Sequence, residues 1–327
     1  MRIVFMGTPD LAAYCLERMI DAGHEVVAVV TAPDRPAGRG RKLHQPMVKQ
    51  VAMNRGLPVL QPESLKSQIF IDQLKTIGPD LQVVVAFRML PEVVWSLPLH
   101  GTFNTHASYL PQYRGAAPIN WVIINGEKET GVSTFLLDKA IDTGKILIRE
   151  KLAIEEGETA GSLHEKMKEA VAGITLRTIK GLSTGDLVPV DQSELLPDAP
   201  LKKAPKIFRE DCRVNWERGP EEIVNLVRGL NPQPGAFADI HDENGRLMAI
   251  KLFEAEASHG HHHYEPGSML TDNQKMIMFA SRGGFVKILR LQLPGKKAMS
   301  AEELLRGYEF RNPNLIRLSN HFGEQNR

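Results

Sequence analysis

A run dominated by β-branched residues, LQVVVAF at 81–87, is the feature that most limits how this chain can fold. A strand with one face in water alternates apolar and polar residues, whereas a strand covered on both faces is apolar along its length. Similar short runs occur at 2–6 and 26–31, and helix-like patterns separate the runs at about 10–22, 47–55 and 68–77. This alternation predicts an α/β fold with a doubly wound, mostly parallel sheet wrapped by helices.

The pattern changes after Gly101. A short strand at 102–104 is followed by a long amphipathic helix at about 162–182, with strand-like segments between them at 132–137 and 146–154. Residues 185–206 contain four prolines and are typical of a linker. Beyond it, short apolar runs alternate with turn residues, which predicts an all-β module with one helix near 221–228. We therefore expect three parts: residues 1–188, a linker at 189–206, and residues 207–327.

The composition is that of an ordinary globular protein, with 42% hydrophobic and 24% charged residues in a chain of 327. A chain of this length buries a large core and needs neither metal ions nor disulfides to hold it together. Cys15 and Cys212 lie far apart, and Cys15 falls in an apolar helical pattern that favours a buried thiol. The first apolar run ends at Gly7, and no stretch is long enough for a membrane span. We expect a cytoplasmic protein.

The turn after the first strand, Gly7-Thr8-Pro9-Asp10, does not fit a nicotinamide or flavin site. A dinucleotide fold needs further glycines here so that the backbone can approach a pyrophosphate, and Pro9 replaces the second of them. Thr8 can instead cap the following helix, with Pro9 in its first turn. The segment therefore predicts a well-capped turn without a dinucleotide cofactor.

The residues best suited to chemistry lie between Phe103 and Pro118. Asn104 and His106 are two positions apart, so on an extended backbone they point to the same side at the carboxyl end of a strand. The first is a neutral amide donor, and the second belongs to the residue type that titrates near neutral pH. Taken singly, each is more simply a packed loop residue. Together, in a segment rich in glycine and proline, they favour a catalytic site.

A second candidate is Asp142, in the sequence Asp142-Thr143-Gly144 that follows a strand. An aspartate close to a glycine commonly stabilises a tight turn. The functional interpretation is a carboxylate that raises the proton affinity of a nearby histidine or receives a proton from an amine. The residues alone leave both interpretations open.

These motifs resemble those of the methionyl-tRNA formyltransferase family, a branch of the folate-dependent formyltransferases. The similarity is carried by Asn104-Thr105-His106 with Ser108–Pro111 and Arg114–Pro118, and by Asp142-Thr143-Gly144. It extends over most of the chain, through Met6–Pro9, Pro33–Gly40, Gly295–Lys297 and Met299–Ala301. The Asn-x-His and Asp motif is shared by all folate-dependent formyltransferases and indicates the chemistry. The loop at 33–40 and the C-terminal module indicate transfer RNA.

The resemblance implies transfer of a formyl group from 10-formyltetrahydrofolate to the amino group of methionine carried by initiator tRNA. Asn104 and His106 are then donors to the oxygen on which charge develops, and His106 also handles protons. Asp142 keeps His106 in its required state and helps to carry the amine proton to the departing folate nitrogen. Because a formyl amide is already a reactive acyl donor, no metal is expected.

For the folate, the resemblance implies a pocket beside the central strand, where backbone groups make much of the contact. Many family members carry an aromatic residue followed by glycine where this chain has Phe87-Arg88, so the pocket is expected to differ in shape. Phe87 and Met89 also fit an ordinary core at a strand end. The implied folate-binding residues are Phe87, Arg88, Met89, Leu90, Ser108, Leu110, Pro111 and Asp138.

For the RNA, the resemblance implies contacts from a basic loop and from the C-terminal module, which is similar to the family's OB-like β-barrel. Arg39 is the loop residue expected to act on the weak closing pair of the acceptor stem. Phosphate contacts of this kind depend on salt and carry little sequence information. The implied tRNA-binding residues are Arg35, Arg39, Arg41, Lys42, Lys203, Lys206, Lys296 and Lys297.

The segment from His259 to His263, with four histidines, lies outside the family pattern. Clustered imidazoles can bind zinc or copper, but no further ligand lies at a suitable spacing, so we expect a solvated loop.

Two alternatives remain open. The acceptor could be a ribonucleotide or an amino sugar, although neither requires a basic loop or a barrel. The chain could also be an RNA-binding protein with an inactive formyltransferase fold, which intact Asn104, His106 and Asp142 argue against. We expect a monomer with no membrane partner.

Overall fold

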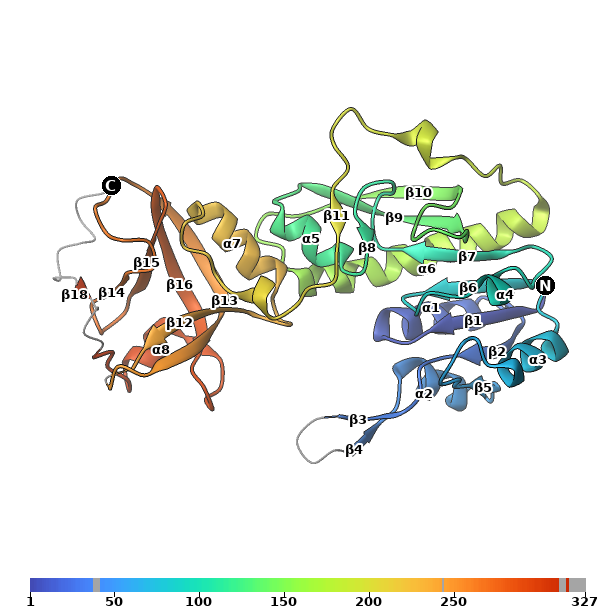
Figure 1. The fold of residues 1–327 in the computed structure, drawn as a ribbon, viewed down its shortest axis with the longest axis horizontal. Helices are drawn as coiled ribbons and strands as arrows, with labels where there is room; N and C mark the ends of the chain where they lie inside the picture. The colour runs from blue at the N-terminus through green and yellow to red at the C-terminus, as the bar shows by residue number, and fades with distance from the viewer. Residues whose placement is uncertain (38–41, 243, 312–315, 318–327) are drawn as a thin grey trace. The chain divides into compact units, whose positions relative to one another are not determined.

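The computed structural model describes residues 1–37, 42–242, 244–311 and 316–317 (Figure 1). These residues form two compact units. The first comprises the described residues within Met1–Pro118, Glu129–Ala153 and His164–Pro205, and the second comprises those within Ile119–Lys128, Ile154–Leu163 and Lys206–Arg327. No helix among the described residues is long and apolar enough to cross a membrane. The limits predicted for independently folding domains, at 188 and 207, stay predictions.

The first unit is built on a seven-stranded sheet in the order β10-β9-β7-β6-β1-β2-β5. The five strands from β7 to β5 are parallel; at one edge β9 pairs antiparallel with β7, and β10 pairs antiparallel with β9. The predicted doubly wound, mostly parallel sheet is therefore confirmed. The strands are β1 (Ile3–Gly7), β2 (Val26–Val30), β5 (Val59–Leu60), β6 (Leu81–Val85), β7 (Thr102–His106), β9 (Glu129–Leu136) and β10 (Ile146–Ala153).

The order in which strands are added to this sheet reverses at the boundary between β1 and β6. From β1 the chain moves outward through β2 to β5, and it then returns to the other side of β1 with β6 and β7. Open α/β sheets bind ligands beyond the carboxyl ends of their strands at such a point. The residues that follow β6 and end β7 lie at this edge, so the fold itself selects where a site can form.

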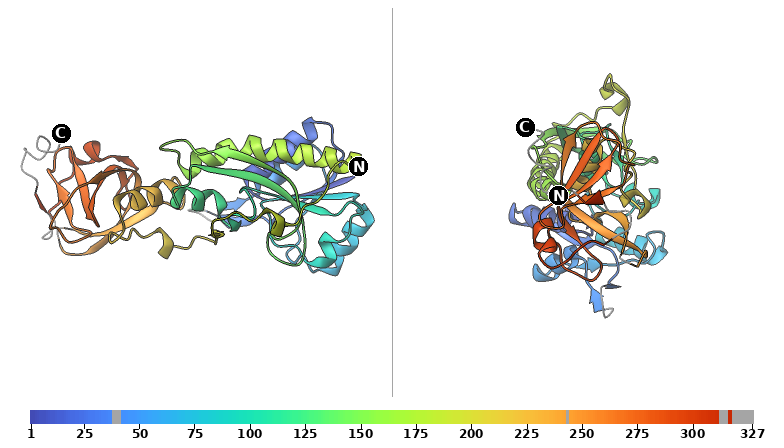
Figure 2. Two further views of the ribbon diagram at one scale, coloured as in Figure 1. Left: turned by 90° about the horizontal axis from the view of Figure 1, so that it is seen from above. Right: turned by 90° about the vertical axis from the view of Figure 1, so that its left-hand side faces the viewer.

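Helices cover both faces of the sheet (Figure 2). On one face, α3 packs Phe70, Ile71 and Leu74 against Val4 and Val84 of the sheet. On the other face, α6 is joined to β7 and β9 by threonine pairs, because the hydroxyl oxygens of Thr105 and Thr175, and of Thr134 and Thr178, are each 2.8 Å apart. The helices are α1 (Asp10–Asp21), α2 (Met47–Asn54), α3 (Gln68–Ile77), α4 (Glu92–Trp95) and α6 (Ala160–Thr184).

The start of α1 corrects one prediction. The helix begins at Asp10, Pro9 occupies the N-cap position, and no side chain caps the helix, so Thr8 does not play the expected role. Proline at the cap already lacks an N–H group, and the acidic Asp10 in the first turn favours the helix dipole. The prediction for Cys15 is confirmed, because its thiol is fully buried and burial raises its pKa to about 12.

The second half of the proline-rich segment forms structure with the first unit. The 3-10 helix η1 (Gln192–Leu195) follows a backbone bridge between Val190 and Ile146. Strand β11 (Lys203–Ala204) then pairs in parallel with β8 (Arg114–Gly115), which places Lys203 opposite Arg114. These residues are therefore fixed to the sheet edge that carries the candidate site.

The second unit is a curled, largely antiparallel sheet in the order β12-β13-β16-β15-β14-β18, with β17 beside β16. This half-barrel is consistent with the predicted OB-like module. Its core includes Ile223 and Val227 of α7 (Pro220–Gly229), which confirms the helix expected there. The remaining elements are β12 (Ala236–His241), β13 (Leu247–His259), β14 (Met269–Thr271), β15 (Ile277–Ser281), β16 (Gly284–Gln292), β17 (Met299–Ser300), β18 (Ile316–Arg317), η2 (Glu210–Cys212) and α8 (Ala301–Leu305). Helix α5 (Pro118–Ile124) lies almost entirely in this unit.

The histidine cluster is the expected loop at 260–263, with His259, His261 and His263 exposed, but His262 is packed. His259 ends β13 and pairs with Glu221, and His262 is half-buried beside the rings of Tyr264 and Phe285. The Nε2 atom of His262 lies 2.8 Å from the carbonyl oxygens of both Ser281 and Gly284. Carbonyl oxygens only accept, so Nε2 carries hydrogen and fastens the turn between β15 and β16.

The α3 face offers a test of this packing. Leu74 is fully buried, whereas Ile69 on the same helix is 74% exposed. Leu74→Ala removes apolar contacts and leaves a cavity, which we expect to cost about 2–5 kcal/mol in the free energy of unfolding. Urea unfolding followed by circular dichroism measures the change. Ile69→Ala is the matched control and should stay within about 0.5 kcal/mol; equal losses would mean that α3 does not pack as described.

Candidate active site

Asn104 and His106 lie on the same face of β7, as their spacing predicted, and Thr105 between them faces α6. His106 is 7% exposed, and its Nε2 atom lies 3.0 Å from the carbonyl oxygen of Tyr113. Because a carbonyl only accepts, Nε2 carries the hydrogen, and Nδ1 has no hydrogen-bond partner among the described residues. The Asn104 amide is half-buried and has no hydrogen-bond partner within the described part of the chain.

Asp142 sits in the expected tight turn, between β9 and β10. Its Oδ2 atom accepts a hydrogen bond of 2.9 Å from the backbone N–H of Gly115. The backbone from Tyr113 to Gly115 therefore holds both candidate side chains, His106 through a carbonyl group and Asp142 through an amide group. This shared attachment brings together two residues that are far apart in the sequence.

The Asp142 turn is tightly constrained. A Cβ atom on Gly144 would lie 1.7 Å from the carbonyl oxygen of Leu136, so only glycine fits there. The Thr143 hydroxyl donates to the Asp138 carboxylate at 2.9 Å, and the N–H of Ala140 donates to the same oxygen at 3.0 Å. The carboxylate predicted for folate binding at Asp138 is therefore bonded within the turn itself.

Unusual backbone conformations gather at this edge of the sheet. Four described residues other than glycine have positive φ, and three of them are at the candidate site: Ala86 after β6 (46°), Tyr113 (61°) and Asp142 (55°). Side chains other than glycine adopt this region at a cost of about 1–2 kcal/mol per residue. Such conformations persist where the surrounding structure enforces them, and they cluster at functional sites.

The loop after β7, residues 107–113, is held in place by buried hydrogen bonds. The Ser133 hydroxyl donates to the carbonyl oxygen of Ser108 at 2.7 Å and accepts from the N–H of Leu110 at 3.0 Å. The Ser108 hydroxyl in turn donates to the carbonyl oxygen of Gln112 at 2.8 Å. Arg149 stacks on the Tyr109 ring from β10, 4.4 Å from its centre. These contacts hold the loop that carries Tyr113, whose carbonyl oxygen bonds to His106.

A residue that the sequence did not single out also belongs to the site. Gln192, in the segment expected to be a linker, is 2% exposed and contacts both Arg114 and the Asp142 turn. No periodicity or motif marks it, because its partners are 78 and 50 positions away.

Comparison with known proteins shows the family of the chain. The formyl transferase model matches residues 1–179, and the model of the formyl transferase C-terminal domain matches residues 206–309. The methionyl-tRNA formyltransferase of Bacteroides thetaiotaomicron is 44% identical over 308 residues, which cover 94% of this chain and 96% of that protein. The chain belongs to the methionyl-tRNA formyltransferase family. The family predicted from the motifs is confirmed.

Other relatives agree with this family. The methionyl-tRNA formyltransferase of Azobacteroides pseudotrichonymphae is 45% identical over 98% of both chains. Among solved structures, an N-formyltransferase from Helicobacter canadensis in complex with folinic acid and dTDP-3-aminofucose matches with a TM-score of 0.62. That match covers 88% of this chain and 98% of the other, but at 18% identity it shows the fold alone.

The residues expected to bind folate differ in how far their side chains are exposed. Met89 is 76% exposed and is not part of the core, Phe87 is half-buried, and Leu90 is buried under the sheet. Leu110 and Ser108 are fully buried, and so is most of Pro111. The buried members therefore present no exposed side chain to a ligand, and the folate contacts stay a prediction.

Arg88 is the residue at which the sequence departs from the expected family pattern. Its guanidinium donates to the carbonyl oxygens of Pro62 at 2.9 Å and Glu63 at 3.2 Å, and it lies 5.3 Å from the centre of the Phe87 ring. Burial lowers the pKa of Arg88, and the nearby positive charge of Arg35 lowers it further. Arg88 therefore braces the end of β6 against the loop after β5.

The residues expected to bind tRNA are exposed where they are described. Arg35 starts the hairpin of β3 (Arg35–Ala37) and β4 (Lys42–His44); Arg39, Arg41 and the Lys42 side chain lie outside the described residues. Lys203 is exposed on β11 in the first unit. In the second unit Lys206, Lys296 and Lys297 are exposed.

Two other clusters have structural explanations. Asp10, His164 and Glu165 are close enough to hold a metal ion, but the Lys168 ammonium lies 2.9 Å from Asp10 and 2.8 Å from Glu165 and already supplies a positive charge. Although burial opposes the effect, hydrogen bonds from Lys168 and His164 lower the pKa of Asp10.

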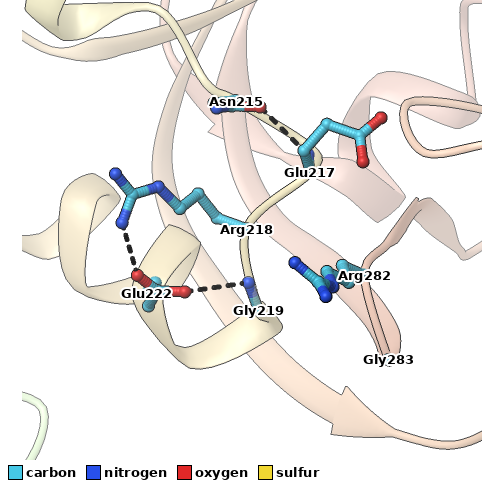
Figure 3. Close-up of a pocket in the computed structure, with 7 residues that line it drawn as sticks. All are labelled: Asn215, Glu217, Arg218, Gly219, Glu222, Arg282 and Gly283. Atoms are coloured by element: carbon cyan, nitrogen blue, oxygen red, sulfur yellow. Dashed lines mark hydrogen bonds and ion pairs between the residues drawn. The ribbon is translucent and has the colours of Figure 1, made fainter.

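A surface hollow of about 650 Å³ lies at the start of α7 in the second unit (Figure 3). Glu222 accepts from Arg218 at 2.7 Å and from the N–H of Gly219 at 3.1 Å, so its carboxylate caps the helix. The hollow contains none of the residues expected to bind tRNA.

The Asp142 turn can be tested through Gly144. Gly144→Ala forces a methyl group onto the Leu136 carbonyl, which we expect to cost about 1–3 kcal/mol and to displace Asp142. The midpoint temperature of thermal unfolding and the rate of formylation should both fall. Gly173→Ala in α6 is the control, since its added Cβ meets nothing closer than 3.9 Å and replaces glycine within a helix. Unchanged activity of the Gly144 variant would contradict the tight turn.

Proposed function

We propose that this chain transfers the formyl group of 10-formyltetrahydrofolate to the amino group of methionyl initiator tRNA, for the initiation of translation. The observation that carries the proposal is the site geometry in a chain of this family. Asn104 and His106 share one face of β7, and the backbone at 113–115 holds His106 and Asp142 together.

Asn104 is the donor to the formyl oxygen. Its amide has no competing partner among the described residues, and β7 fixes it at the carboxyl edge of the sheet. When the amine attacks the formyl carbon, negative charge builds on the formyl oxygen. A donor already aimed at that oxygen lowers the barrier without having to reorganise, which is worth about 3–4 kcal/mol in comparable sites.

His106 and Asp142 handle the protons. Because Nε2 of His106 is bound to the Tyr113 carbonyl, Nδ1 is the ring nitrogen that takes or gives a proton. Asp142 uses Oδ2 for the Gly115 N–H and keeps Oδ1 without a partner in the described part of the structure. That oxygen can accept the proton that the attacking amine loses, and the proton then passes to the folate nitrogen as the carbon–nitrogen bond to folate breaks.

The folate lies beside the residues that follow β6. The exposed Met89 and the half-buried Phe87 offer an apolar surface for the pterin, and the backbone between Phe87 and Leu90 offers donors and acceptors. Asp138 contributes through the shape of its turn, since its carboxylate is already bonded to Thr143.

The tRNA is bound through phosphate contacts. Arg35 and Lys203 serve in the first unit and Lys206, Lys296 and Lys297 in the second, together with Arg39, Arg41 and Lys42 of the hairpin loop. Exposed cations bind phosphate by releasing counterions, so affinity should fall as salt rises. We also propose that the enzyme acts as a monomer in the cytoplasm, where charged initiator tRNA is used.

A direct test measures formylation of charged initiator tRNA, with elongator methionyl-tRNA as the control acceptor. The expected result is rapid transfer to the initiator and slow transfer to the elongator. Amino sugars and amino-bearing ribonucleotides supplied in parallel test the other acceptors. Formylation of a small amine without formylation of initiator methionyl-tRNA would overturn the proposal.

We expect Asn104→Ala to lower kcat by about 10²–10³-fold, because it removes the donor to the developing charge. Single-turnover formylation of methionyl-tRNA gives the rate of the chemical step. The KM for tRNA and the thermal stability should change little, since the amide has no partner in the described fold. A parallel rise in KM with an unchanged kcat would assign Asn104 to binding instead.

Lys203→Ala should weaken tRNA binding and reduce the slope of log affinity against log salt by about one unit. Affinity for tRNA measured by filter binding at several salt concentrations gives this slope. Lys75→Ala, an exposed lysine on α3, is the matched control and should leave the slope unchanged. If the slope of log affinity against log salt were the same in both variants, Lys203 would not be part of the RNA-binding surface.

A further inference from the structure

Gln192 is a buried amide that connects two parts of the candidate active site. Its side chain is 2% exposed, although glutamine is normally found at the surface. The Nε2 group donates to the carbonyl oxygens of Asp142 at 2.9 Å and Gly144 at 2.8 Å. The Oε1 atom accepts from the Nε and the terminal nitrogen of Arg114, at 3.1 and 2.5 Å.

These four contacts use everything that a glutamine amide can offer, since it has two N–H donors and one oxygen with two lone pairs. They also fix which way the amide points. The reverse orientation would place the NH₂ group against the Arg114 guanidinium and the oxygen against two carbonyl oxygens. Gln192 therefore has one orientation that satisfies all its partners.

The backbone that carries Gln192 is anchored independently of these contacts. Val190 exchanges two backbone hydrogen bonds with Ile146, of 2.8 and 2.9 Å. Asp191 then caps η1 by accepting from the N–H and the hydroxyl of Ser193, and these hydrogen bonds lower the pKa of Asp191. The amide is thus brought to the Asp142 turn by a rigid segment.

Both partners of Gln192 belong to the candidate machinery. Arg114 immediately precedes Gly115, whose N–H holds the Asp142 carboxylate, and the Asp142 carbonyl is itself a Gln192 acceptor. Asp142 has φ of 55°, a conformation that the surrounding contacts must hold. One side chain therefore fixes the donor and the acceptor of the Gly115–Asp142 hydrogen bond relative to each other.

We propose that Gln192 is a positioning residue for formyl transfer, which sets the place of the Asp142 carboxylate beside Gly115. The inference rests on the proposed role of Asp142. Gln192 does not touch a reacting atom; it acts through Asp142 and through the Arg114–Gly115 backbone. Because a displacement of about 1 Å in a catalytic group can cost on the order of 100-fold in rate, the effect should appear in kcat.

The test uses the full chain with two variants, Gln192→Ala and Gln192→Glu. Alanine removes all four contacts. Glutamate keeps the size of the side chain and the bond to Arg114, but it loses both donors and turns an oxygen toward two carbonyl groups. We expect kcat to fall about 10- to 100-fold in each, with the larger loss for glutamate and with the KM for folate and tRNA within about twofold. Gln68→Ala, an exposed glutamine on α3, is the control.

A double-mutant cycle with Asp142→Asn separates positioning from general support of the fold. If Gln192 acts through Asp142, then Gln192→Ala should cause little further loss of kcat once Asp142 is replaced. The same fold-loss in both backgrounds would overturn the inference, as would wild-type kcat in both Gln192 variants. If Gln192→Ala fails to fold, the double-mutant cycle is measured with Gln192→Glu in its place.

The role proposed for Asp142 and the role proposed for Gln192 can be overturned separately. Wild-type kcat in Asp142→Asn alone would overturn the proposed role of Asp142, and the inference with it. Reduced kcat in Asp142→Asn together with wild-type kcat in the Gln192 variants would overturn only the inference and leave the proposed function standing.

Discussion

The short backbone stretch from Tyr113 to Gly115 holds the candidate site together through two opposite hydrogen bonds. The Tyr113 carbonyl accepts from His106, and the Gly115 N–H donates to Asp142. The same stretch has φ values of 61° at Tyr113 and 130° at Gly115, both outside the regions that most residues adopt. Pairing of β8 with β11 supplies the support, and a Cβ at Gly115 would lie 2.3 Å from the Ala204 carbonyl oxygen.

The parts of the molecule that local patterns encode were predictable from the sequence. The strand at 81–85 and the shared face of Asn104 and His106 follow from side-chain alternation and burial, which depend on near neighbours. The cap predicted for α1 was wrong, because the helix begins without a side-chain hydrogen bond from Thr8. The packing of His262 was also missed, since its two carbonyl partners lie about 20 positions away.

Gln192 shows why the rest of the site could not be found this way. A polar residue in a segment rich in proline has no period and no local partner, so composition predicts only a linker. Its burial becomes evident when residues 78 and 50 positions away are brought beside it. Arg88 is the opposite case. The sequence marked it as a departure from the family, and the structure gives it a bracing role through the carbonyl groups of Pro62 and Glu63.

The attachment of residues 190–204 to the first unit also bears on how such enzymes can be recombined. This stretch is fastened at Val190 and again at β11, so the chain between the two points has a set span to cover. A hybrid joined before Pro189 would supply foreign residues to the Asp142 turn, whereas one joined after Pro205 would keep that turn with its own partners. Of these two junctions, only the later one keeps the partners of the Asp142 turn.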